Sequence, residues 1–358
     1  MKTSYRFRQI RSLIGWSGCL GGIAVCGLGL SAFVAPNVWF ADNMSFFIRQ
    51  FLAAGFTGLM ATAIGFSVPH RAPRLYRTTA SLLLVCFLLL SGLTAWRTFQ
   101  FTAPIAESAS ATSIRIVSIN LEQLYLKDET LTRYLESVRP DVLVFQETGW
   151  WWQRKRLSEQ DIHGGTSPLP EYLYAGELGN VVVYSKFPIA AAKTIVLQGT
   201  SNRGRYGLKE IVTVSLSVSG RIVDLIAIHP TSPRSERRWL ARQSYLDTLA
   251  EVTEATGTGP NARTIVIGDW NLSPWSAHFA AFFDRLGMKT AFPDGVPQTT
   301  RFFFDYRLHW LLGAVVDHVA ISPSLSFADV RLGPNIGSDH LPLQVDVLFP
   351  TPASADQN

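Results

Sequence analysis

Acidic, amide and imidazole side chains recur where apolar runs of this sequence end. The clearest case is residues 264–274, TIVIGDWNLSP, where an apolar run typical of a buried strand is followed by Asp269 and Asn271. Residues two apart on a strand point to the same side of the pleat, so these two side chains are expected to lie together. An Asp at such a point is costly to bury unless it holds a metal, a hydrogen bond or a partner charge. Asp and Asn are also common turn residues, so this stretch alone fits either a turn or an active site.

Other apolar runs of the chain end in the same way. The polar residues at or near these ends are Asn120, Glu122, Glu147, His229, Asp317, Asp339 and His340. If the ends meet at one rim, their oxygens suit a hard divalent ion such as Mg²⁺ or Mn²⁺, since no Cys is among them and His is scarce. A metal that polarises a phosphoryl oxygen, a His–Asp pair acting as base and amide donors around the phosphate would make a phosphoester hydrolase. A lone His before a Pro, such as His229, is more often structural.

The excess of positive charge in the chain comes from its first 104 residues. The net charge is +5, but residues 1–104 hold nine Lys or Arg side chains and a single acid, Asp42. The other 254 residues carry 23 basic and 26 acidic side chains, which argues against an avid nucleic-acid binder. They are numerous enough to bury a large core in one domain.

Three apolar stretches, residues 12–34, 46–68 and 80–96, predict transmembrane helices within an anchor of residues 1–101. A cleaved signal peptide is the alternative for the first stretch, but two more apolar stretches follow closely. Basic residues before the first stretch and between the other two place the N-terminus in the cytoplasm of a multi-pass inner-membrane protein. The domain that follows is then extracytoplasmic, in the periplasm. The three cysteines, Cys19, Cys26 and Cys86, lie in the apolar stretches, which leaves the exported domain without thiols.

After the anchor we expect a small-residue linker at 102–112, a catalytic domain at 113–348 and a disordered tail at 349–358. Within the domain, Asp128 is a predicted N-cap for a helix over 129–138, and residues 219–220 predict a hairpin turn.

Two groups of cations could meet an anionic substrate. One is a polar loop with Arg203 and Lys209, and the other is a helix face formed by Arg234, Arg238 and Arg242. The alternative for the helix is a solvated charged face. The three tryptophans at 150–152 could touch the membrane or a substrate, or they could simply pack in a loop.

These residues together resemble the endonuclease/exonuclease/phosphatase superfamily, which includes deoxyribonucleases, abasic-site endonucleases, neutral sphingomyelinases and inositol-phosphate 5-phosphatases. The resemblance covers about residues 113–348, and its membrane-anchored arrangement is similar to that of bacterial members. Six motifs follow the family's order: Asn120 in VSINL, Gln146-Glu147, His229, Gly268-Asp269-Trp270-Asn271, Asp317 and Ser338-Asp339-His340. Each motif is weak alone, and their shared order is specific. The resemblance implies a four-layered α/β/β/α sandwich of two packed mixed sheets.

The resemblance also implies roles for these residues. Glu147 would be the main metal ligand, with Asn120 and Glu122 completing its surroundings and Asp339 near the metal. His340 would be the general base, oriented by Asp317 rather than by Asp339. Asp269 would orient the attacking water, while Asn271 and His229 would hold phosphate oxygens. Glu122 and His318 depart from the family, which often has Asp and an aromatic residue there, and His318 is interpreted as structural.

The substrate is left open among a lipid phosphodiester, nucleic acid and a phosphomonoester, because fold does not decide among phosphoesters. The anchor and the tryptophans favour a lipid head group at the bilayer. A non-catalytic module that binds a phosphorylated ligand is the contrasting class, although no core residue of the motif set is missing. No obligatory protein partner is evident.

Overall fold

The computed structural model describes residues 2–65, 73–106, 112–153, 169, 171–176, 180–197 and 209–349. Contacts divide the chain into two compact units. The first unit comprises residues 1–100 together with Pro274–Ala277, and the second comprises Phe101–Ser273 with His278–Asn358. We call them the helical unit and the sheet unit.

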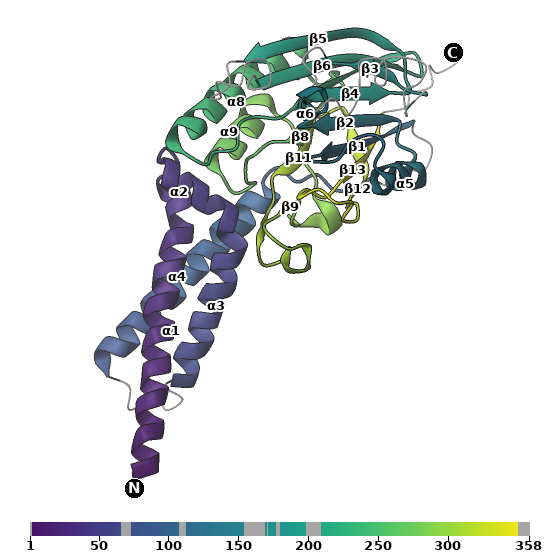
Figure 1. Ribbon diagram of the computed structural model, residues 1–358. Helices are drawn as coiled ribbons and strands as arrows, with labels where there is room; N and C mark the ends of the chain where they lie inside the picture. The colour runs from purple at the N-terminus through teal and green to yellow at the C-terminus, as the bar shows by residue number, and fades with distance from the viewer. Residues whose placement is uncertain are drawn as a thin grey trace. The chain divides into compact units, whose positions relative to one another are not determined.

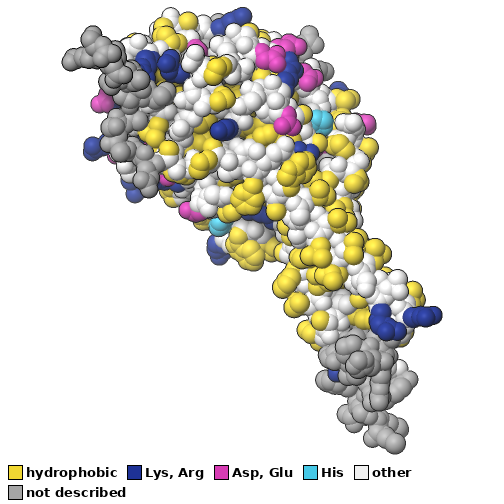
Figure 2. Space-filling model, turned by 180° about the vertical axis from the view of Figure 1, so that it is seen from behind, with side chains coloured by type: hydrophobic (Ala, Val, Ile, Leu, Met, Phe, Trp, Pro, Cys, Tyr) yellow, Lys and Arg dark blue, Asp and Glu magenta, His cyan; other side chains and the backbone are white. Residues whose placement is uncertain are grey.

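The helical unit contains three helices that are long and apolar enough to cross a membrane. Its elements are α1 (Lys2–Val34), α2 (Trp39–Asn43), the 3-10 helix η1 (Met44–Phe47), α3 (Ile48–Gly65) and α4 (Arg74–Phe99). Apolar side chains cover much of the face of this unit that Figure 2 shows. The segment between the first two apolar stretches contains α2 and η1, which extend the second candidate span to Trp39–Gly65.

Small residues let α1 and α3 approach closely. A Cβ on Gly58 would lie 2.7 Å from the carbonyl oxygen of Gly18, and one on Gly65 would lie 2.4 Å from the Cα of Gly15. Close backbone contact of this kind is typical of helix pairs in membranes. There the helices associate through van der Waals packing, which small residues allow, because lipid provides no hydrophobic driving force. The glycine-rich composition of the apolar stretches therefore has a packing role.

The sheet unit contains two mixed sheets (Figure 1). The six-stranded sheet has the order β12-β13-β1-β2-β4-β3 and the five-stranded sheet the order β11-β8-β7-β6-β5. Strands β1 and β2 are parallel, as are β7 and β8, while the other neighbours are antiparallel. The strands of the first sheet are β1 (Ser113–Asn120), β2 (Val142–Gln146), β3 (Leu173–Ala175), β4 (Val181–Ser185), β12 (Ser326–Leu332) and β13 (Leu343–Leu348). Those of the second are β5 (Ile189–Leu197), β6 (Lys209–Val218), β7 (Arg221–Ile228), β8 (Thr264–Asp269) and β11 (Asp317–Ile321).

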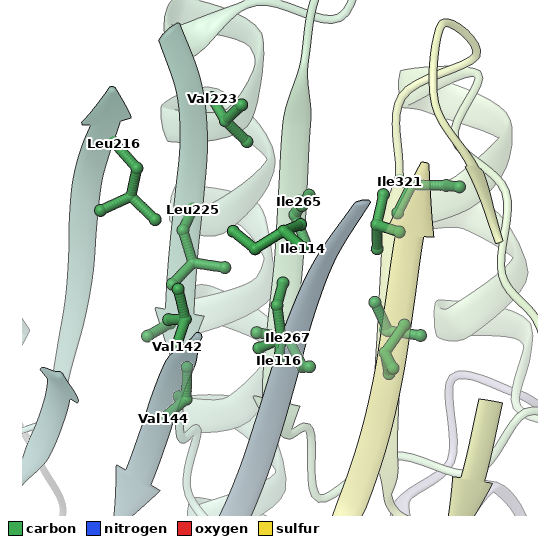
Figure 3. Packing of buried hydrophobic residues seen from close by; sticks show 14 of the residues in the cluster. Ile114, Ile116, Val142, Val144, Leu216, Val223, Leu225, Ile265, Ile267 and Ile321 are labelled. Atoms are coloured by element: carbon green, nitrogen blue, oxygen red, sulfur yellow. The ribbon is translucent and has the colours of Figure 1, made fainter. Parts of the chain in front are cut away.

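Alternation along β1 shows how the layers are held together. Ile114 and Ile116 point into a core shared with Ile265 and Ile267 of the other sheet, as Figure 3 shows. Val117 and Ile119 point the opposite way and pack with α5 (Glu129–Val138) and α6 (Trp150–Gln153). The outer face of the second sheet is covered by α8 (Glu236–Thr256) and α9 (Ala277–Leu286). Helices thus cover the outer face of each sheet over its central strands, and the predicted four-layered α/β/β/α sandwich is confirmed.

A short two-stranded hairpin lies outside these sheets. It consists of β9 (Arg301–Phe302) and β10 (Gly313–Ala314), with the 3-10 helix η5 (Tyr306–Leu308) between them. A further 3-10 helix, η4 (Pro293–Gly295), precedes it.

Some local expectations differ from the structure. The predicted helix over 129–138 is confirmed with Asp128 at its N-cap, but the Asp128 side chain makes no bond to it, and Oδ2 accepts from the backbone nitrogen of Tyr125 instead. Part of the expected linker pairs with the sheet unit, since Ala103 N donates to Thr290 O and Ala106 N donates to Phe327 O. The predicted hairpin at 219–220 joins β6 and β7 and is confirmed. The expected disordered tail lies outside the described residues, apart from Phe349.

Candidate active site

The first part of the site is built by the adjacent ends of β1 and β2. The two strands are parallel, and Asn120 is paired with Gln146, so Glu147 follows directly beside Asn120. The amide nitrogen Nδ2 of Asn120 donates to Glu147 Oε1 at 3.2 Å and to Asp269 Oδ2 at 3.0 Å. Because Asp269 belongs to the other sheet, Asn120 joins the two sheets at this rim. Glu147 itself has φ +63° and a side chain that is 43% exposed, so its carboxylate remains open to solvent.

The motif Gly268–Asn271 supplies the second part of the site. A Cβ on Gly268 would lie 2.2 Å from Ile228 O, so only Gly fits where β7 and β8 are parallel neighbours. The strand ends at Asp269, and Asn271 lies beyond it at φ +46°. The two side chains do meet, but the expected reason was wrong. An Asx turn brings them together, in which Asn271 N donates to Asp269 Oδ1 at 2.8 Å and Asn271 Nδ2 to Oδ2 at 3.1 Å.

A His–Asp pair forms the centre of the site. His340 Nδ1 lies 2.9 Å from Asp317 Oδ2, and both side chains are almost fully buried. The other ring nitrogen, Nε2, lies 3.7 Å from Asp269 Oδ2 and 3.6 Å from Asp339 Oδ1. Asp317 is the direct antiparallel partner of Asp269 across β11 and β8, which explains why these two carboxylates converge on one imidazole.

His229 follows β7 and is 4% exposed. Its Nδ1 lies 3.3 Å from Lys209 Nζ, while its Nε2 lies 3.6 Å from both Glu147 Oε1 and Asp269 Oδ2. An ammonium can only donate, so Nδ1 is the acceptor and Nε2 carries the proton. His229 thus presents an N–H to the same space that the carboxylates of Glu147 and Asp269 face.

Asp339 is held between a cation and a backbone bond. Arg301 donates to Asp339 Oδ2 through Nε at 3.1 Å and through Nη2 at 2.9 Å. The backbone nitrogen of Asp339 donates to Glu122 Oε2 at 3.1 Å, and Glu122 N donates to Asn120 Oδ1 at 3.1 Å. Glu122, like Glu147 and Asn271, has a positive φ. Strained backbone at three positions of one cluster is typical of a functional site.

Burial and neighbouring charge shift the titration of these groups. Burial lowers the pKa of His340, but the carboxylates of Asp317 and Asp269 outweigh burial and raise it to about 9. Burial raises the pKa of Asp269 to about 6, against the opposing effect of His340. Burial, helped by the charge of Lys209, lowers the pKa of His229 well below its ordinary value. His229 is therefore neutral, whereas His340 is drawn towards its charged form.

Several residues singled out in the sequence lie elsewhere. Arg203 is outside the described residues, and Arg234 is exposed with no contact to the His–Asp pair among those described. The interpretation of α8 as a single solvated or substrate-facing cationic face was wrong. Arg242 is fully buried, and its Nη1 donates to the carbonyl oxygen of Asn271 at 2.8 Å, so it supports the Asx turn.

The neighbour of Asp317 points away from the site. His318 is 2% exposed, its Nε2 donates to Leu272 O at 2.8 Å, and its ring lies against Trp270 and Phe279. Of the three adjacent tryptophans, Trp151 is buried and its Nε1 donates to Leu124 O. Both residues therefore pack inside the unit.

The donor set fits a hard divalent cation. The amide of Asn120 contacts carboxylate oxygens of Glu147 and Asp269, Asp339 lies near His340, and none of these described side chains carries sulfur. Asp269, Asp317 and His340 also form a cluster whose ligand atoms lie within 4.8 Å of one another. Because Asp317 already holds His340 Nδ1, the half-exposed Glu147 is the more accessible ligand. Oxygen donors of this kind are those that Mg²⁺ and Mn²⁺ prefer.

Two cations of the site differ from the sequence-based expectation: Arg301 was not predicted, and Lys209 was predicted in a loop. Arg301 belongs to no motif, and it reaches Asp339 because it forms a bridge with His340 at the base of the β9–β10 hairpin. Lys209 was placed in a polar loop, yet it is the first residue of β6 and contacts His229. Only their position in the sheet, and no local sequence signal, identifies them.

Comparisons with known proteins agree on one family. Residues 117–340 match the Endonuclease/Exonuclease/phosphatase family. The human Nocturnin catalytic domain, solved with bound sulfate, has a TM-score of 0.50 and 20% identity over 71% of this chain and 98% of its own. TDP2 from D. rerio, solved with a single-strand DNA product, has a TM-score of 0.50 and 17% identity over 66% of this chain and 99% of its own. Sphingomyelinase C from Streptomyces griseocarneus has a TM-score of 0.48 and 16% identity over 66% and 99%, respectively.

A comparison with curated proteins finds no match. The structural likenesses show the fold, and the sequence match covers more than half of the chain. This chain belongs to the endonuclease/exonuclease/phosphatase family, whose members are hydrolases of phosphoester bonds.

Proposed function

We propose that the sheet unit hydrolyses a phosphodiester by attack of water, with His340 as general base and Asp317 as its orienting partner. The observation that carries this proposal is the 2.9 Å contact between His340 Nδ1 and Asp317, which leaves Nε2 facing Asp269 and Asp339. The distances of 3.6–3.7 Å from Nε2 to these carboxylates are too long for direct bonds and suit a shared water.

The proposed steps follow from the residues around that water. Asp269 accepts one hydrogen of the water and orients it, while His340 Nε2 takes the proton as the oxygen bonds to phosphorus. The bond between phosphorus and the leaving oxygen breaks, and the released alkoxide is protonated by solvent. The N–H of His229 and the amide of Asn271 would hold the phosphate oxygens, and Lys209 keeps His229 in the tautomer that this requires.

Glu147 and Asn120 would hold a divalent cation, with Asp339 and Glu122 beside it. Bound there, Mg²⁺ or Mn²⁺ would polarise the phosphoryl group, and its charge would lower the pKa of His340 towards the range in which it acts as a base. Arg301, which already pairs with Asp339, would partly neutralise the charge of that carboxylate beside the cation.

We also propose that the three apolar helices span the inner membrane with the N-terminus in the cytoplasm. The distribution of basic residues supports this orientation, in which the sheet unit would lie in the periplasm.

The test is a substrate panel with the full chain in nanodiscs. The panel contains bis(p-nitrophenyl) phosphate, a phosphomonoester, single-stranded DNA and a phospholipid. We expect hydrolysis of at least one phosphodiester, reduced by about 10²–10⁴ in His340→Ala. Equal rates for the wild type and His340→Ala would refute the site. Binding of phosphate with no turnover of any ester would favour the non-catalytic module instead.

A further inference from the structure

The β9–β10 hairpin is connected at both ends to residues of the candidate site. At its base, Phe302 N donates to Asp339 O at 3.0 Å, and Arg301 pairs with the Asp339 side chain. At its other end, Ala314 stands three residues before Asp317, and Thr300 Oγ1 accepts from Asp317 N. Both ends of the hairpin are thus fixed to the residues around the His–Asp pair, and its tip lies between them in sequence, at residues 303–312.

The tip carries a concentration of exposed apolar side chains. Among the described residues of the sheet unit, eleven large apolar side chains are exposed, and five of them are in this tip: Phe304, Leu308, Trp310, Leu311 and Leu312. They include both of the exposed Phe and Trp side chains of the described sheet unit, Phe304 at 96% and Trp310 at 64%. Single exposed apolar residues are ordinary, but a cluster of this kind marks an interaction surface.

Phe304 is also unfavourable for folding of the isolated unit. Its φ of +68° lies in the left-handed region, where a residue with a large side chain is disfavoured, and its ring is almost completely exposed. Gly or Asn would satisfy this backbone better. The side chain therefore contributes almost nothing to packing within the described unit.

An open cleft connects the tip with the site. Its volume is about 640 Å³, and its lining includes Phe304 and Tyr306 of the tip as well as Glu122 and Asp339 of the site. Aromatic and acidic side chains both line the cleft. This combination suits a molecule with an apolar part and a polar head that can reach the carboxylates through a cation.

The chain connectivity ties the sheet unit to the membrane that α4 is proposed to cross. Helix α4 ends at Phe99, and Phe101 O already accepts from Thr290 N within the sheet unit. No long linker separates them, so a membrane crossed by α4 would lie close to the sheet unit. Trp and Phe side chains on a tip prefer the interface between lipid head groups and acyl chains.

We propose that the tip of the β9–β10 hairpin inserts Phe304 and Trp310 into the bilayer surface and that the substrate is a membrane phospholipid. Its head group would enter the cleft, and water would break one phosphorus–oxygen ester bond, with the released alcohol taking a proton. The substrate part of this inference rests on the proposed phosphodiesterase function, whereas the insertion does not.

The first experiment compares two substrates of the full chain in nanodiscs. One is water-soluble bis(p-nitrophenyl) phosphate, and the other is phosphatidylethanolamine with a radiolabelled ethanolamine group in the disc. In Leu308→Ser/Trp310→Ser, which changes exposed tip residues outside the cleft lining, release of the label should fall about tenfold or more because the tip loses apolar side chains that would be buried in the bilayer. The soluble ester should be turned over nearly as before. The control Ile222→Ser/Leu240→Ser, which removes exposed apolar side chains elsewhere, should change neither rate.

The second experiment needs no activity. Lipids brominated in their acyl chains should quench part of the tryptophan fluorescence of the wild type, and this part should be lost in Trp310→Phe. An unquenched Trp310 would overturn the insertion and would assign the tip to a protein partner instead. Turnover of the soluble ester without any turnover of the phospholipid, or an equal fall of both rates in the double variant, would overturn the lipid substrate. Failure of the wild type on both substrates would refute the proposed function itself, and the quenching would still decide the insertion.

Discussion

At the scale of residues, the account depends on two side chains acting as one unit. Asp317 orients His340 and stabilises its charged form, so removal of either disables the same proton transfer. His340→Ala and Asp317→Asn should each lower kcat/KM by about 10²–10⁴, and the double variant should be far less impaired than the product of the two effects. The measurement is a double-mutant cycle on the soluble phosphodiester. Multiplicative losses would show that the two residues act independently and that the pairing is misassigned.

The matched control is the residue next to Asp317. His318→Ala removes an imidazole that packs against Trp270 and bonds to Leu272 O on the far face of β11. It should cost about 2–4 kcal/mol of stability, as for other large-to-small core changes, and little rate. A rate loss as large as that of His340→Ala would place His318 in the site.

Burial of His318 should also make the free energy of unfolding depend on pH. Burial lowers the pKa of His318 to about 4, whereas an unfolded His titrates near 6.5. As pH falls below about 6.5, the unfolded chain takes up a proton that the folded chain refuses, so stability is lost down to about pH 4. His318→Gln should therefore flatten the fall of the thermal unfolding midpoint between pH 6.5 and 4.5. An unchanged acid limb would mean that other groups cause it.

At the scale of elements, the close contact of β7 and β8 fixes where Asp269 emerges. Gly268→Ala would place a Cβ 2.2 Å from Ile228 O at φ +152°. We expect a loss of about 1–3 kcal/mol or more, seen as a lower unfolding midpoint. Gly220→Ala is the control, because Gly220 also has positive φ (+76°) but no atom within 4 Å of an added Cβ. Equal losses in the two variants would show that strain in φ, and not the contact with β7, explains the glycine.

The elements also show what sequence could and could not predict. Apolar alternation and the order of motifs indicated β1, β2, β7, β8 and β11 and the two-sheet sandwich, because these strands are buried on one or both faces. Strands β5 and β12 were not predicted, because most of their residues are only partly buried or exposed and their apolar alternation is therefore weak. The Asx turn at Asp269 and Asn271 could not be told from a strand in the sequence, because both conformations bring side chains two residues apart to the same side. Arg301, Lys209 and the hairpin tip reach the site only through tertiary pairing, which no local pattern encodes.

At the scale of the whole molecule, the orientation of the chain can be tested directly. A reporter enzyme that is active only in the periplasm, fused after Thr102, should be active, because the basic residues at the start of α1 and at Arg71, Arg74 and Arg77 favour the cytoplasm. A cytoplasmic reporter at the same position should be silent. The reverse pattern would place the sheet unit in the cytoplasm and would overturn the proposed location.

The central claim is that oxygen ligands at the rim of the sandwich hold a divalent cation for phosphodiester hydrolysis. The most direct measurement is turnover of bis(p-nitrophenyl) phosphate by the full chain in nanodiscs, first with excess chelator and then after titration with Mg²⁺ or Mn²⁺. The account predicts that chelation abolishes turnover, that either metal restores it, and that Glu147→Gln needs more metal for the same rate. Undiminished turnover in excess chelator would contradict it.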